Sequence, residues 1–211
     1  MKTRGLICLL PAAILLGATG RLTSANLVAN PGFETGNFSG WTTTAASSGS
    51  SFGVDNTNPH SGTFAAFFSG AGPFFDHIDQ SFVTPPGTTY DLSFWLAGDV
   101  NKNPEGFFVN MFRVTWGSTL LVNTNFTSSF AYTQFTFTGL TPDPIGGGST
   151  NLEFGGFNNG GVFSLDDISL TRVSAAVPDS GSSALLLSLG LVGLVLTQSA
   201  LSWLKIPGQA A

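Results

Sequence analysis

Short runs in which apolar and polar residues alternate fill the middle of this 211-residue chain. In Tyr90–Leu96 the residues of one parity are all apolar, and Phe112–Trp116 follows the same pattern. A period of two is that of a β-strand with one buried face. Further strand-like runs lie at residues 64–68, 78–82, 135–137, 152–154 and 163–170.

Turn-forming residues separate these runs, and no long stretch has helical periodicity. The turn signals lie at residues 58–62, 85–87, 116–118, 141–144 and 158–161. Many short strands at this spacing predict an all-β fold, a jelly-roll β-sandwich. Large aromatic residues dominate the cores of such domains, so Trp41 and Trp116 are expected to be buried.

The sequence is poor in charge, with 9% Asp, Glu, Lys and Arg against roughly 25% in average soluble proteins. Residues 26–176 hold eleven acidic and three basic side chains. These basic groups are too few to neutralise a run of phosphates, which excludes nucleic acid as a partner. A single cysteine, Cys8, excludes a disulfide scaffold. The uncharged Ser, Thr, Asn and Gly of the domain suit a hydroxyl-rich partner or matrix outside the cell.

The N-terminal 25 residues have the pattern of a secretory signal peptide. Two basic residues, Lys2 and Arg4, precede a short apolar run, and Thr23-Ser24-Ala25 supplies the small residues of a cleavage site. We therefore expect an N-terminal signal helix, secretion across the inner membrane and cleavage after Ala25.

A second apolar run occupies residues 184–204. Its 21 residues would form a helix about 30 Å long, which matches the bilayer core. A single transmembrane helix is expected here, with residues 174–183 as a linker and 205–211 as a short cytoplasmic tail.

The linker contains the pentapeptide Val177-Pro178-Asp179-Ser180-Gly181. Together with the apolar run and the signal peptide, it resembles the VPDSG form of the PEP-CTERM sorting signal. The resemblance implies anchoring in the membrane through the C-terminal helix and processing by an exosortase. The protein would then reach the cell surface or the extracellular matrix.

Both ends of the middle domain resemble carbohydrate-binding modules of the galactose-binding-like fold. The segments that carry the resemblance are Asn26–Glu34, followed by Gly40-Trp41, and the run Phe163–Leu170. The resemblance implies a jelly-roll domain over residues 26–173 that binds polysaccharide without catalysis.

Similar modules hold a structural Ca²⁺ ion. By motif, the resemblance assigns it to Glu34, the backbone from His60 to Gly62, and Asp166 or Asp167. Calcium takes six to eight carboxylate and carbonyl oxygens, so these donors are chemically suitable. The parity of apolar residues changes at Asp166-Asp167, which predicts a β-bulge there. The alternative is that both Asp side chains face solvent.

Four residues are candidates for sugar binding. Trp95 has the opposite parity to its apolar neighbours and is expected to point outward, unless it packs under a loop. Asn110 and Arg113 could bond hydroxyl groups near it, and Tyr132 could lie at the rim of the site.

Catalysis has weaker support in the sequence. Asp76, His77 and Asp79 are potential metal ligands or acid/base groups, and Glu105 and Glu153 are further carboxylates that could serve a glycosidase. No motif for a nucleophile, zinc or phosphate accompanies them. The protein is therefore expected not to be an enzyme. Two alternatives to polysaccharide binding stay open, a self-assembling matrix protein and a glycoside hydrolase.

Overall fold

The computed structural model describes residues 24–46, 49–70, 74–100 and 110–173. These residues form strands and contain no helix. The strands are β1 (Thr42–Thr44), β2 (Phe52–Asp55), β3 (Ala65–Phe68), β4 (Asp76–Val83), β5 (Thr89–Asp99), β6 (Asn110–Trp116), β7 (Thr119–Asn125), β8 (Phe130–Leu140), β9 (Ser149–Asn158) and β10 (Val162–Val173).

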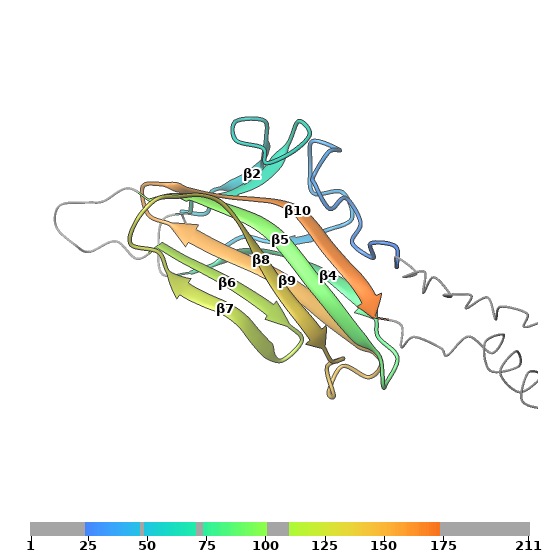
Figure 1. The fold of residues 1–211 in the computed structure, drawn as a ribbon. Coiled ribbons are helices and arrows are strands. Elements are labelled where there is room, and N and C mark those ends of the chain that lie inside the picture. The colour runs from blue at the N-terminus through green and yellow to red at the C-terminus, as the bar shows by residue number, and fades with distance from the viewer. Residues whose placement is uncertain (1–23, 47–48, 71–73, 101–109, 174–211) are drawn as a thin grey trace, which may run out of the picture.

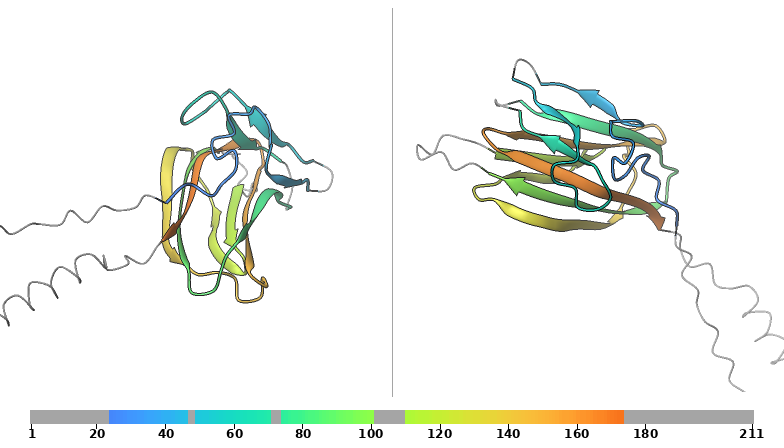
Figure 2. Two further views of the ribbon diagram at one scale, coloured as in Figure 1. Left: turned by 90° about the vertical axis from the view of Figure 1, so that its right-hand side faces the viewer. Right: turned by 90° about the horizontal axis from the view of Figure 1, so that it is seen from above.

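Two five-stranded antiparallel sheets pack face to face (Figures 1 and 2). Sheet A has the order β1-β4-β9-β6-β7, and sheet B has the order β2-β3-β10-β5-β8. Consecutive strands are often placed in different sheets, so the chain crosses repeatedly between the two layers. This arrangement agrees with the expected jelly-roll sandwich.

The core lies between the sheets because alternate residues of each central strand point inward. In β5, Tyr90, Leu92, Phe94 and Leu96 are fully buried, as their parity predicts. Sheet A contributes residues such as Phe154 from β9. The rings of Phe94 and Phe154 meet edge to face with their centres 5.1 Å apart, a favourable aromatic geometry that joins the two layers.

The two tryptophans expected in the core are there. Trp116 is 1% exposed and Trp41 is 7% exposed. The Trp116 indole N–H donates to the backbone carbonyl of Thr141 at 2.6 Å, so its polar atom is satisfied.

The predicted bulge in the last strand is confirmed. The register of β10 against β5 shifts between Asp166 and Ser169, and Asp167 has a positive φ of 49°. Because the extra residue restores the parity, the apolar residues on both sides of the bulge point into the core. These are Phe163, Leu165, Ile168 and Leu170.

The first described residues run beside the last strand. Leu27 N donates to Leu170 O at 2.8 Å, and Asn26 Nδ2 donates to Ile168 O at 2.9 Å. Among the described residues, none forms a helix that could cross a bilayer. The signal peptide of residues 1–25 falls almost entirely outside the described residues. The 174–183 linker with its Val177–Gly181 motif, the 184–204 helix and the 205–211 tail lie wholly outside them.

Candidate functional site: the outer face of sheet A

The outer face of sheet A carries a row of polar residues across its central strands. His77 of β4 pairs with Gly155 of β9, and Gly155 pairs with Arg113 of β6. In the next row Glu153 of β9 lies between Asp79 and Thr115. These residues alternate with buried ones, so their side chains point away from the core.

Three of these side chains form a cluster with Phe75, which directly precedes β4. We call it the Arg113 cluster: Phe75, His77, Arg113 and Glu153. Arg113 Nη2 donates to Glu153 Oε1 at 2.7 Å, and the guanidinium carbon lies 4.5 Å from the centre of the Phe75 ring. His77 Nε2 lies 4.0 Å from Glu153 Oε2. A third of the Arg113 side chain and a quarter of the His77 side chain stay exposed.

Two polar atoms of the Arg113 cluster have no partner. Arg113 Nε and His77 Nδ1 are buried, and no described residue forms a hydrogen bond with either. Buried polar atoms without partners are uncommon in proteins because they lose their hydration without compensation. Both atoms lie beside the Arg113–Glu153 ion pair, which is partly exposed.

Aromatic surface adjoins the polar cluster. Gly155 leaves room for Phe75: a side-chain carbon added at Gly155 would meet Phe75 Cβ and Cδ1 at 3.4 Å. Phe157 packs edge-on against Phe75, with ring centres 5.1 Å apart. The neighbouring Phe74 is 60% exposed. The rings of Phe75 and Phe157 are thus packed beside the charged groups, and Phe157 is only 4% exposed.

Asp79 adds a perturbed carboxyl to this face. Burial raises the pKa of Asp79 above its ordinary value of 3.8, and the nearby charge of Glu153 raises it further. His77 and a hydrogen bond from Asn151 act in the opposite direction. The site therefore combines one guanidinium, two carboxyls and an imidazole.

The structure does not bring the four predicted sugar-binding residues together. Arg113 belongs to the sheet A face, whereas Trp95 and Tyr132 lie on the outer face of sheet B. Asn110 is buried at the start of β6, where its side-chain amide donates to the backbone carbonyl of Phe126 at 3.3 Å. These residues therefore occupy three separate places in the sandwich.

Trp95 points outward, as its parity predicts, but the loop between β2 and β3 (residues 56–64) covers it. The His60 ring stacks on the Trp95 indole with centres 4.0 Å apart and planes 18° apart. Tyr132 meets the same imidazole edge-on at 4.9 Å. The alternative in which Trp95 packs under a loop therefore describes its surroundings.

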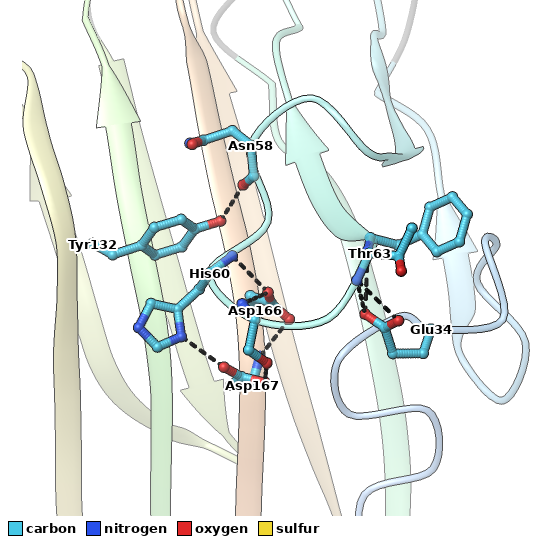
Figure 3. Close-up of polar contacts among 9 residues, drawn as sticks. Glu34, Asn58, His60, Thr63, Tyr132, Asp166 and Asp167 are labelled. Atoms are coloured by element: carbon cyan, nitrogen blue, oxygen red, sulfur yellow. Dashed lines mark hydrogen bonds and ion pairs between the residues drawn. The ribbon is translucent and has the colours of Figure 1, made fainter.

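The predicted calcium residues do gather around this loop. Asp166 is fully buried and accepts hydrogen bonds from His60 N at 2.9 Å and Ser61 N at 3.1 Å. Asp167 Oδ2 lies 2.6 Å from His60 Nδ1. Glu34 accepts hydrogen bonds from the backbone N–H groups of residues 63 and 64, beside Gly62 (Figure 3).

A calcium ion suits the chemistry of these donors. A side-chain carbon added at Gly32 would come within 3.4 Å of Asp166 Oδ1 and 3.5 Å of Asp167 Oδ1, so one oxygen of each carboxylate lies beside Gly32. Burial raises the pKa of Asp166, backbone hydrogen bonds lower it and the charge of Asp167 raises it. Within the described ranges, no three His, Cys, Asp or Glu side chains are arranged to hold a metal by themselves. An ion at this place would need backbone carbonyls as well.

Three residues of this face, Phe75, Gly155 and Phe157, were not predicted as parts of a site. Their signal is weak, because Phe75 precedes its strand and a glycine in a strand predicts only a close approach. His77 and Glu153 were weighed as catalytic groups, and it is their register with Arg113 that places all three on one face.

Comparison with known proteins places the domain in a family. No curated protein sequence matches the chain. Among solved structures, TmCBM61 in complex with β-1,4-galactotriose is similar, with 21% identity, a TM-score of 0.55 and coverage of 71% of this chain and 100% of that one. A Stig cyclase, Fisc from Fischerella sp. TAU, has 17% identity and a TM-score of 0.51, over 72% of this chain and 99% of the cyclase. Both likenesses show the fold. Residues 25–154 match the family described as "Carbohydrate binding domain", and the chain therefore belongs to that carbohydrate-binding family.

Proposed function

We propose that the protein binds polysaccharide without catalysis through the outer face of sheet A. The observation that carries the proposal is the Arg113 cluster, in which a partly exposed guanidinium pairs with Glu153 and lies over an aromatic ring. Membership of the carbohydrate-binding family supports the same activity.

The chemistry of the face suits a sugar chain. Phe74, which is 60% exposed, can pack against the C–H face of a pyranose ring, while Arg113 and Glu153 can bond its hydroxyls. The strands present these groups on rigid elements, so little ordering is needed on binding. The carboxyls of Asp79 and Glu153 would repel an acidic polysaccharide, which favours a neutral one.

Isothermal titration of the full chain in a sugar-free detergent tests the proposal. The probes are β-1,4-galactotriose, cellotetraose and xylotetraose, with an alginate oligosaccharide as the acidic comparison. We expect at least one neutral probe to bind and both Arg113→Ala and Phe75→Ala to weaken it. Thr136→Ala, an exposed position on β8, is the matched control and should bind normally.

The two alternatives give different results. A hydrolase would release reducing ends from the polysaccharide and lose this activity in Glu153→Gln. A self-assembling matrix protein would bind none of the probes and would form concentration-dependent oligomers. Either result would contradict the proposal.

A structural Ca²⁺ ion is a second part of the proposal. It would be held by Glu34, Asp166 or Asp167, and backbone oxygens around residues 60–62, and it would tie the β2–β3 loop to the last strand. A bound ion raises the melting temperature by mass action, so EDTA should lower it and added Ca²⁺ should restore it. An unchanged melting temperature would show that no ion is bound.

Secretion and sorting complete the proposal and depend on the sequence alone. Cleavage after Ala25 and exosortase processing near Val177–Gly181 would release the domain to the cell surface or matrix. Mass spectrometry of the protein from its native cells should find a form that lacks residues 1–25 and one shortened at the C-terminal end. A single full-length species would contradict both steps.

A further inference from the structure

The outer face of sheet B holds two cavities that the proposed site does not use. Each has a volume of about 370 Å³, within the range of roughly 300–1,000 Å³ that is typical of small-molecule sites. One lies against Tyr132 and the ends of β5 and β8, and the other against Phe67 and the start of β10. Asn58 and Asp99 line both cavities, so the two adjoin.

The loop that separates the cavities is held firmly. The Asn58 side-chain amide donates to Ser164 Oγ at 3.2 Å. The backbone carbonyl of Asn58 accepts from the Tyr132 hydroxyl at 2.5 Å. Two residues later, the backbone N–H groups of His60 and Ser61 donate to buried Asp166 (Figure 3). The walls are therefore formed before any ligand arrives, which reduces the entropic cost of binding.

The lining of the cavities has the chemistry of a sugar site. Phe67 lines one cavity and packs against Gly53, where an added side-chain carbon would come within 2.8 Å of its ring. Hydroxyl groups such as Ser69 and Ser164 and the carboxylates Asp55 and Asp99 surround it. The described residues that line the two cavities include no Lys, Arg or His. Such a lining suits an uncharged polyhydroxylated ligand and disfavours an acidic one.

We propose that the outer face of sheet B is a second glycan site, specific for neutral saccharides, with Asn58 and Asp99 at its centre. The outer faces of the two sheets point in opposite directions (Figure 2). With a glycan site on each sheet, one domain would hold two polysaccharide chains and cross-link them. This consequence rests on the proposed sheet A site.

Titration of the full chain with the same neutral oligosaccharides tests the second site. We expect two binding sites per chain. Asn58→Ala and Asp99→Ala should each weaken one site about tenfold, because each removes hydrogen bonds to the ligand. Arg113→Ala should weaken only the other site. Asp99 is exposed, so its variant should fold even if Asn58→Ala disturbs the loop, and the melting temperature of each variant checks this.

The results distinguish the two sites. One site per chain that is lost in Arg113→Ala and kept in Asp99→Ala would overturn the second site and leave the proposed function intact. One site per chain that is lost in Asp99→Ala and kept in Arg113→Ala would overturn the sheet A site and leave the sheet B site intact. Mixing the wild-type chain with soluble neutral galactan should produce turbidity that either single variant abolishes. If a chain with two sites produces no turbidity, cross-linking is overturned.

Discussion

Replacement of Arg113 by alanine should separate binding from folding. The side chain makes one ion pair, to Glu153 at 2.7 Å, and one cation–π contact, to Phe75 at 4.5 Å. Because a third of the side chain is exposed, the two contacts contribute only about 0.2–1 and 0.5–1 kcal/mol respectively. The free energy of unfolding should therefore fall by about 1–2 kcal/mol, and the domain should stay folded.

The effect of the same change on binding should be larger. Hydrogen bonds from a charged group contribute roughly 1.5–3 kcal/mol, which corresponds to a ten- to 150-fold loss of affinity. Arg113→Lys keeps the charge but not the planar fork, so its affinity should be intermediate. Isothermal titration measures the affinity, and urea unfolding measures the stability. An Arg113→Ala protein that is folded and binds the glycan within twofold of wild type would show that Arg113 does not bond the glycan.

Three further outcomes are expected. Burial raises the pKa of Asp79, so the folded chain retains this proton to higher pH than the unfolded chain, and its ionisation lowers stability as pH rises above 3.8. Urea unfolding at several pH values should show Asp79→Asn gaining stability relative to wild type as pH rises; a constant difference would contradict this. Asp76 is fully buried and accepts hydrogen bonds from Ala46 N and Ser51 N, so Asp76→Ala should cost roughly 2–4 kcal/mol in the same assay, and a loss below 1 kcal/mol would contradict its role. In calorimetry, EDTA should lower the melting temperature of wild type but not that of Asp166→Asn, and equal shifts would argue against calcium at Asp166.

The central strands of the fold could be predicted from the sequence because one face of each is buried. The runs in β5 and β6 alternate cleanly, and the change of parity at Asp166 located the bulge in β10. The strands β1, β2 and β7 were not predicted. All three residues of β1 are exposed and β7 has one buried residue, so burial leaves little pattern in their sequences.

The site was harder to predict because parity shows that a side chain points outward but not from which sheet. Trp95 and Arg113 both have outward parity, yet β5 belongs to sheet B and β6 to sheet A. The cover over Trp95 also depends on His60, a loop residue whose position is fixed by Asp166, more than 100 residues away in the chain. Such contacts depend on topology, which one sequence does not determine.

Amide chemical shifts during titration with a neutral oligosaccharide would show whether the outer face of sheet A binds a glycan. We expect saturable shifts at His77, Arg113, Glu153 and Gly155, on three neighbouring strands of one face. Shifts confined to sheet B, with these four amides unchanged at saturation, would contradict this expectation.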